Sequence, residues 1–283
     1  MVVKQYGEGY RSNRLHSVAV LKQFGFGDKR RMEAIIHSEA EHLMEHMRAQ
    51  NGIAVDPADS LMLSILNVIY QLLFGKRFEA NDPPEVYIRE TIKQFAVSAD
   101  PVYEVFPIVA HLPRYKKKLA DMLPVSKKLM RFLRDKIRDC VESDADENFV
   151  AEYVKRVGQN FDETELRFIL RDFVMGGTET TETTSTQMTW AMILLANHPE
   201  VQTSVQSELD SVVSRNRLAS MDDKAMLPYF EAVTLEIMRY RPIAPLALPR
   251  VTLCDTEAVG YSIPDGTMVS VRRRVAMVCS IVW

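Results

Sequence analysis

The stretch Gly176-Gly177-Thr178-Glu179-Thr180-Thr181 decides the fold of this 283-residue chain. It lies in the middle of a helical pattern that opens at a capping box, Asp162 with Glu165, and continues to Asn197. Residues 176–186 contain two glycines and six threonines, and each such residue weakens a helix interior by roughly 0.5–1 kcal/mol. A purely structural helix would not gather them at its midpoint, so the pattern favours a functional site that a flat ligand can approach closely. From this segment alone, a break between two helices at Gly176 stays an equal alternative.

The rest of the chain has helical periodicity almost throughout, which predicts a mainly α fold with a long central helix. The apolar helix between Pro57 and Gly75 must be buried on most sides. The last part differs, because prolines and turn residues favour short β-strands over residues 250–271. Further helices are expected over 10–24, 29–50, 84–98, 124–141, 149–157, 199–213 and 228–240.

Composition restricts the class of protein. Basic and acidic residues number 35 and 38, for a formal charge of −3, and apolar residues make up 47%. Such a chain can bury a core, and it has no basic excess for binding nucleic acid. The three cysteines form no paired framework, which indicates a reducing compartment. No stretch of roughly 20 apolar residues is present to span a bilayer as a helix.

A carboxylate and a guanidinium stand three residues apart in the predicted helix 228–240. Glu236 and Arg239 therefore share a helix face and can form an ion pair. Their apolar neighbours make burial plausible, although such pairs usually lie on solvated faces.

Several motifs in order resemble one family, the cytochrome P450 haem-thiolate monooxygenases, in their microsomal family-2-like branch. The segment 176–181 resembles the oxygen-binding groove of the family's long central helix, and Glu236-Ile237-Met238-Arg239 resembles its ExxR motif. The segment 260–267 resembles the strand pair that follows. Supporting matches are Tyr6-Gly7, Tyr10 and Arg14, the stretch from Asn67 to Phe78, and His198-Pro199-Glu200-Val201.

This resemblance implies a partial P450 domain over residues 1–271, an unrelated tail over 272–283, and haem as cofactor. It implies that Glu179 and Thr180 relay protons to dioxygen and that Gly176 and Gly177 leave room over the haem. Arg14 and Arg250 would meet the haem propionates, and Tyr10 stands where the family usually has tryptophan. Glu236 and Arg239 would be a structural pair, and the substrate pocket would include Phe173, Ile243, Leu246 and Leu248.

The resemblance also implies a reaction and partners. One oxygen atom of O2 would enter an apolar substrate of the fatty acid, steroid or xenobiotic class, with electrons from NADPH–cytochrome P450 reductase. The location would be the cytoplasmic face of the endoplasmic reticulum membrane. The apolar stretch 105–112 and the basic residues of 114–118 suggest contact with a membrane surface, and a solvated charged turn is the alternative.

The chain departs from the family at its defining element, an axial cysteine in a loop written FxxGxxxC. Cys140, Cys254 and Cys279 all lie outside such a loop. We therefore expect no axial metal ligand here, a chain cut at both ends without a membrane anchor, and no activity as it stands. The alternatives are a non-catalytic truncated isoform or a helical module that binds a ligand or partner.

One other pattern suggests metal binding. His42 and His46 are four residues apart on a predicted helix, near Glu39 and Glu45. That spacing can bind zinc, but the pattern is HLMEH rather than HExxH and it offers no third ligand. A solvated helix face is therefore the favoured interpretation.

Overall fold

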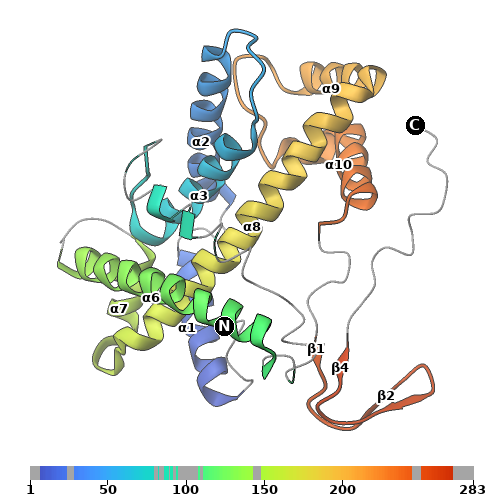
Figure 1. The fold of residues 1–283 in the computed structure, drawn as a ribbon. Helices are drawn as coiled ribbons and strands as arrows, with labels where there is room; N and C mark the ends of the chain where they lie inside the picture. Colours follow the sequence, from blue (N-terminus) through green and yellow to red (C-terminus); the bar gives the residue numbers. More distant parts are fainter. Residues whose placement is uncertain are drawn as a thin grey trace. The chain divides into compact units, whose positions relative to one another are not determined.

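The computed structural model describes residues 7–23, 29–79, 82, 86–88, 90–91, 94, 108, 111–142, 148–243 and 250–269. For residues 175–182 the description covers the backbone alone. The chain divides into two compact units, residues 1–185 and 186–283. Most described residues are helical, as Figure 1 shows. The α-helices are α1 (Glu8–Gln23), α2 (Lys29–Ala49), α3 (Ala58–Phe74), α6 (Pro113–Glu142), α7 (Phe149–Val157), α8 (Glu163–Asn197), α9 (Pro199–Val212) and α10 (Pro228–Tyr240). Two short 3₁₀ helices among the described residues are η2 (Gly158–Asn160) and η3 (Asp223–Met226).

The first unit has a continuous apolar core around α3. That helix packs against α2 and α7, and α7 also contacts α1 and α6. Its nearly all-apolar sequence predicted deep burial, and the structure confirms this. Gly75 ends α3 in the left-handed conformation (φ 69°), which glycine adopts without strain. The core includes Val20, Leu66, Leu73, Leu129, Leu133, Phe149, Leu166 and Leu170.

Helix α8 is uninterrupted from Glu163 to Asn197, a length of 35 residues or about 52 Å. Asp162 caps its start, because its Oδ1 accepts the N–H of Thr164 at 2.7 Å. The alternative of a helix break at Gly176 is therefore wrong. Helical residues on both sides and the buried residues Leu166, Ile169 and Leu170 outweigh the weak centre.

Helix α6 starts earlier than the sequence predicted. It begins at Pro113 and runs through Pro124, whereas residue 124 was the expected start. Both prolines suit a first helical position, and the structure uses Pro113 there. Pro124 is exposed, so water can satisfy the carbonyl group that its missing N–H leaves unpaired. The basic residues after 113 therefore lie on a helix rather than in a turn, and Lys116 and Lys117 are exposed, so contact with a membrane surface stays a prediction. The expected helix 84–98 lies mostly outside the described residues.

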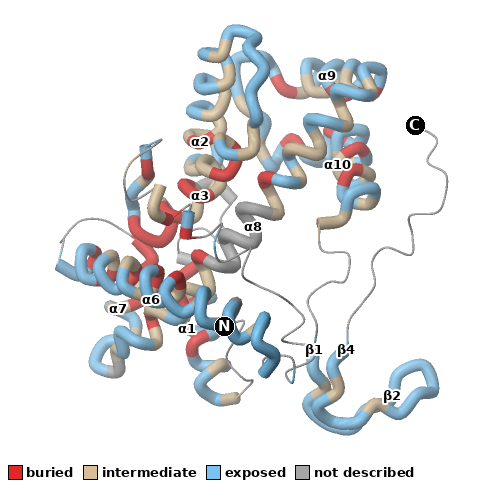
Figure 2. The backbone as a smooth tube through the Cα atoms, in the orientation of Figure 1, coloured by how far each residue is buried: buried red, intermediate tan, exposed pale blue. Residues whose placement is uncertain are grey.

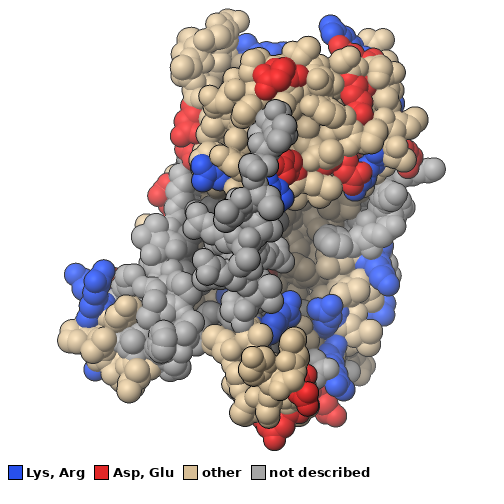
Figure 3. Space-filling model, turned by 90° about the vertical axis from the view of Figure 1, so that its right-hand side faces the viewer, with Lys and Arg blue, Asp and Glu red and all other residues tan. Residues whose placement is uncertain are grey.

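The second unit has a small core between α9 and α10. Val201 and Val205 of α9 pack with Val233 and Ile237 of α10. Among residues 250–269, which the structure describes, four strands form two antiparallel pairs: β1 (Arg250–Val251) with β4 (Met268–Val269), and β2 (Thr256–Ala258) with β3 (Tyr261–Ile263). Figure 2 shows these strands as almost wholly exposed. The predicted small β region is thus confirmed. Over the upper part of the face drawn in Figure 3, separate acidic and basic groups are scattered among uncharged residues.

Candidate functional site

The predicted oxygen-binding groove lies within α8. Its backbone is helical at Gly176, Gly177, Glu179 and Thr180. Helical spacing places positions 176, 177 and 180 on one face, three and four residues apart. That face therefore has no Cβ one turn before the position of Thr180, and the role of the two glycines in leaving room for a flat ligand stays a prediction. The roles of Glu179 and Thr180 as proton carriers stay predictions.

Phe173, one turn before the groove, belongs to the core of the first unit. Its half-buried ring packs edge-on against Phe149, with ring centroids 5.1 Å apart and planes at 75°. Phe149 itself is fully buried. This packing fixes the Phe173 ring, so a pocket role would use its remaining exposed edge.

Tyr10 and Arg14 lie four residues apart on α1, and so share a face of that helix. Tyr10 is half-buried and Arg14 is exposed. Arg14 makes no ion pair among the described residues, so its guanidinium is available to an anionic group. The predicted pairing of both residues with a cofactor is compatible with this position.

Glu236 and Arg239 form the predicted ion pair on α10. Arg239 Nε and Nη2 donate to the two carboxylate oxygens of Glu236 at 2.6 and 2.8 Å. The hydrogen bonds from Arg239 hold the pKa of Glu236 below its ordinary value. The two side chains are 25% and 32% exposed, so within this unit the pair is half-solvated rather than buried. The start of α10 is fixed by Glu208 of α9, whose carboxylate accepts the N–H groups of Tyr229 and Phe230.

The remaining predicted residues of the second unit are partly described. Arg250 lies exposed on β1, opposite Val269 of β4, and makes no ion pair among the described residues. Ile243 is half-buried after the end of α10. Leu246 and Leu248 fall outside the described residues.

The zinc-like pattern on α2 does not bring a metal site together. His42 and His46 are exposed, and their rings contact Ser38 and Gln50 of their own helix. Within the described part of the chain, no three metal-binding side chains converge. The interpretation as a solvated face is correct for the histidines and wrong for Glu39, which is only 2% exposed.

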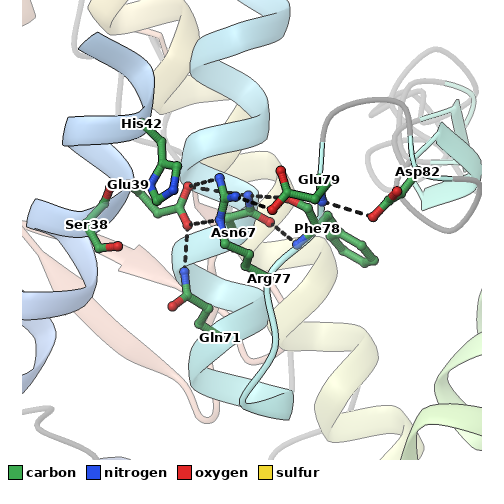
Figure 4. Close-up of polar contacts among 9 residues, drawn as sticks. All are labelled: Ser38, Glu39, His42, Asn67, Gln71, Arg77, Phe78, Glu79 and Asp82. Atoms are coloured by element: carbon green, nitrogen blue, oxygen red, sulfur yellow. Dashed lines mark hydrogen bonds and ion pairs between the residues drawn. The ribbon is translucent and has the colours of Figure 1, made fainter. Parts of the chain in front are cut away.

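Glu39 is the centre of a buried polar network, drawn in Figure 4, which joins α2 to α3 and the segment after it. Its Oε1 accepts from Gln71 at 2.7 Å and from Arg77 at 2.9 Å, and its Oε2 accepts from Asn67 at 3.3 Å. Asn67 also exchanges two hydrogen bonds with the backbone of Phe78. Sequence reasoning missed this network, because its members are up to 38 residues apart.

A family model supplies the deciding observation. The model for cytochrome P450 matches residues 1–273 of the chain. The chain belongs to the cytochrome P450 family.

Curated P450 relatives agree with this assignment. The chain is 32% identical over 298 residues to cytochrome P450 2D10 of Rattus norvegicus. This match covers 100% of this chain and 58% of the relative. It is 33% identical to cytochrome P450 2D9 of Mus musculus, over 95% of this chain and 55% of the relative. It is 31% identical to the vitamin D(3) 25-hydroxylase of Sus scrofa, over 100% of this chain and 58% of that relative. The chain thus spans somewhat more than half the length of these relatives.

The fold has a solved P450 counterpart. A zebra fish cytochrome P450, in a structure with progesterone, matches with a TM-score of 0.79 and 24% identity, over 96% of this chain and 64% of that one. The mainly α, partial P450 fold is therefore confirmed. In the described part of the chain, no helix combines the length and apolar character needed to cross a membrane.

The cysteines decide how well this P450 chain fits a haem-thiolate centre. Cys140 is buried in the core of the first unit, and burial raises the pKa of its thiol, which disfavours a thiolate. Cys254 is exposed between β1 and β2, and Cys279 lies outside the described residues. The described cysteines, one buried with a disfavoured thiolate and one exposed between two short strands, therefore do not suit the axial position of a haem.

Proposed function

We propose that this chain carries the oxygen-binding and substrate-binding part of a cytochrome P450 monooxygenase. The reaction of the whole domain inserts one oxygen atom of O2 into an apolar substrate of the fatty acid, steroid or xenobiotic class. The observation that carries the proposal is the unbroken α8 through Gly176-Gly177 in a chain of this family. One relative is named for vitamin D(3), and the zebra fish P450 was solved with progesterone, and both compounds are apolar.

The residues of the chain divide into binding and proton-transfer roles. The haem iron, when bound, supplies dioxygen activation. Arg14 of the first unit and Arg250 of the second would each offer a charge-assisted hydrogen bond to a haem propionate, with Tyr10 as a further donor. The hydroxyl of Thr180 can accept and donate a proton at one atom, and the carboxylate of Glu179 can recruit that proton from water. Substrate contacts come from Phe173, Ile243, Leu246 and Leu248.

The electron donor and the location are part of the same proposal. NADPH–cytochrome P450 reductase would supply electrons at the cytoplasmic face of the endoplasmic reticulum. The domain would comprise residues 1–271, with an unrelated tail over 272–283. Glu236 and Arg239 would hold the core together near the proximal side of the haem.

These 283 residues by themselves do not assemble the haem-thiolate centre, because none of their cysteines stands in an FxxGxxxC loop. The test is the difference spectrum of the purified, reduced chain with carbon monoxide after haem is added. We expect no thiolate-type Soret band, because no thiolate binds the iron. A thiolate-type Soret band from this chain would overturn the expectation that these residues do not assemble the haem-thiolate centre.

A non-catalytic binding function is the second candidate, and it is favoured because Cys140 and Cys254, the cysteines that the structure describes, both lie outside an FxxGxxxC loop. It is distinguished by titration with an apolar fluorescent fatty acid in the absence of haem. Saturable binding without haem would support this alternative, and binding that appears only after haem is added would favour the first proposal.

The start of α6 supports contact with a membrane surface. Ile108, Leu112 and Leu123 are 78%, 52% and 58% exposed, and Lys116 and Lys117 are exposed among them. Apolar side chains beside lysines favour an anionic bilayer. We expect Lys116→Ser with Lys117→Ser to weaken co-sedimentation with phosphatidylserine vesicles by about thirtyfold, at about 1 kcal/mol for each of the two lost cations.

A matched control lies on the same helix. Lys127 and Lys128 are also exposed, but the turns around them carry the buried side chains Val125 and Leu129. The double change to serine there should leave vesicle binding within about twofold of the starting chain. Equal loss in both double variants would show a general charge effect and contradict the surface contact.

A further inference from the structure

The loop between α9 and η3 presents a serine behind two arginines, in the order Arg215-Asn216-Arg217-Leu218-Ala219-Ser220. Ser220 is half-buried, and the residues on both sides of it are exposed. Backbone hydrogen bonds run from Arg217 to Ser214 and from Asp223 to Ser220, at 3.2 and 3.1 Å. Both are local turns in a mostly exposed segment, and such a segment opens locally at low cost.

Ser220, Arg217 and Asp223 form one compact polar cluster. The Oγ and the backbone N–H of Ser220 both donate to Asp223 Oδ2, at 3.1 and 2.8 Å. Arg217 donates to both carboxylate oxygens of Asp223, at 2.6 and 2.8 Å. The Arg217 guanidinium and the Ser220 N–H hold the pKa of Asp223 far below its ordinary 3.8, so this carboxylate stays ionised.

We propose that Ser220 is a phosphorylation site for a serine/threonine kinase that recognises arginines three and five residues before its target. The class of kinase follows from which charged side chains near Ser220 are exposed. Arg217 and Arg215, at those two positions, are 45% and 83% exposed. Asp223, three residues after Ser220, is 6% exposed and bound to Arg217, so the folded loop offers a kinase its basic side chains rather than an acidic one.

The chemistry is an ordinary phosphoryl transfer with ATP as donor. The Oγ of Ser220 attacks the γ-phosphorus, a new P–O bond forms, and the bond to ADP breaks. ADP leaves with the bonding electron pair, and the hydroxyl proton passes to the catalytic carboxylate of the kinase.

The cluster gives this modification a structural consequence. The phosphate brings a charge of about −1.5 to −2 next to the ionised Asp223. The modified Oγ can no longer donate to Asp223. Arg217 is exposed enough to turn to the phosphate, whose oxygens suit a bidentate guanidinium. Asp223 begins η3, and Lys224 of η3 pairs with Glu231 of α10 at 3.1 Å. Phosphorylation therefore loosens η3 and its link to α10.

The test treats the purified chain with MgATP and the isolated catalytic subunit of an arginine-directed kinase, with an acidophilic kinase in a parallel arm. Peptide mass spectrometry locates the phosphate. We expect it at Ser220, with a severalfold lower initial rate in Arg215→Ala, because the Arg215 side chain is 83% exposed and pairs with the exposed Asp210, outside the Ser220 cluster. Ser214 is a matched control, because it is exposed in the same loop and has no arginine three or five residues before it. Faster modification by the acidophilic kinase, or equal modification of Ser214, would overturn the proposal.

Hydrogen exchange tests the structural consequence. In the phosphorylated chain the amides of Ser220 and Asp223 should exchange at least severalfold faster than in the unmodified chain. Ser220→Ala keeps the backbone donor to Asp223, so its exchange should stay near the unmodified rate with or without kinase treatment. Unchanged exchange after stoichiometric phosphorylation would refute the release of Asp223.

Discussion

Replacing Glu39 with alanine is expected to destabilise the first unit by about 3 kcal/mol, because it breaks a buried ion pair from one side. The carboxylate accepts from Arg77, Gln71 and Asn67, and its side chain is only 3% exposed. Without it, three donors that folding has removed from water lose their acceptor. Arg77 is 24% exposed, so water recovers part of the loss, which places the effect at the lower end of the usual range.

The measurement is hydrogen exchange of the α2 and α3 amides, since a two-unit chain does not have one well-defined unfolding free energy. Glu41→Ala is the matched control, because Glu41 is exposed on the same helix and its loss should cost less than about 0.5 kcal/mol. Glu39→Gln keeps the shape and one acceptor, so it should fall between the two. Equal exchange in Glu39→Ala and Glu41→Ala would show that the network adds no stability.

Glu39 also shows where sequence reasoning reached its limit. Periodicity and capping residues predicted α7 and α10 to the residue, because their boundaries depend on local signals such as Asn148 and Pro228. The direction of one side chain depends on partners 28 to 38 residues away. Local pattern contains no information on such pairs, so a carboxylate beside two exposed histidines looked solvated.

In the candidate site, too, the sequence predicted local contacts but not burial. The spacing of Glu236 and Arg239 predicted their ion pair, because both residues lie on one turn of helix. Their exposure did not follow from the sequence, since apolar neighbours such as Leu235 and Met238 are themselves 59% and 50% exposed in this chain. The prediction of where α6 starts was wrong for a third reason. Two prolines offered equivalent starts, and only tertiary packing distinguishes them.

Replacing Thr180 with alanine is expected to uncouple oxygen consumption from product formation by about tenfold or more. The suitable protein is a chimera, in which residues 1–271 continue into a segment that carries an FxxGxxxC loop. Thr180 offers a hydroxyl that both accepts and donates, and alanine removes the only such atom at that position. The measured quantity is product formed per NADPH consumed, with an apolar steroid as substrate.

Helix energetics separate this effect from misfolding. Threonine weakens a helix interior relative to alanine, so Thr180→Ala should strengthen α8 slightly. Thr186→Ala makes the same chemical change at an exposed position of the same helix and should leave coupling unchanged. Thr180→Ser keeps the hydroxyl and should retain most of the coupling. If Thr180→Ala couples as well as Thr186→Ala, the threonine does not carry the proton, and the weak centre of α8 serves ligand access alone.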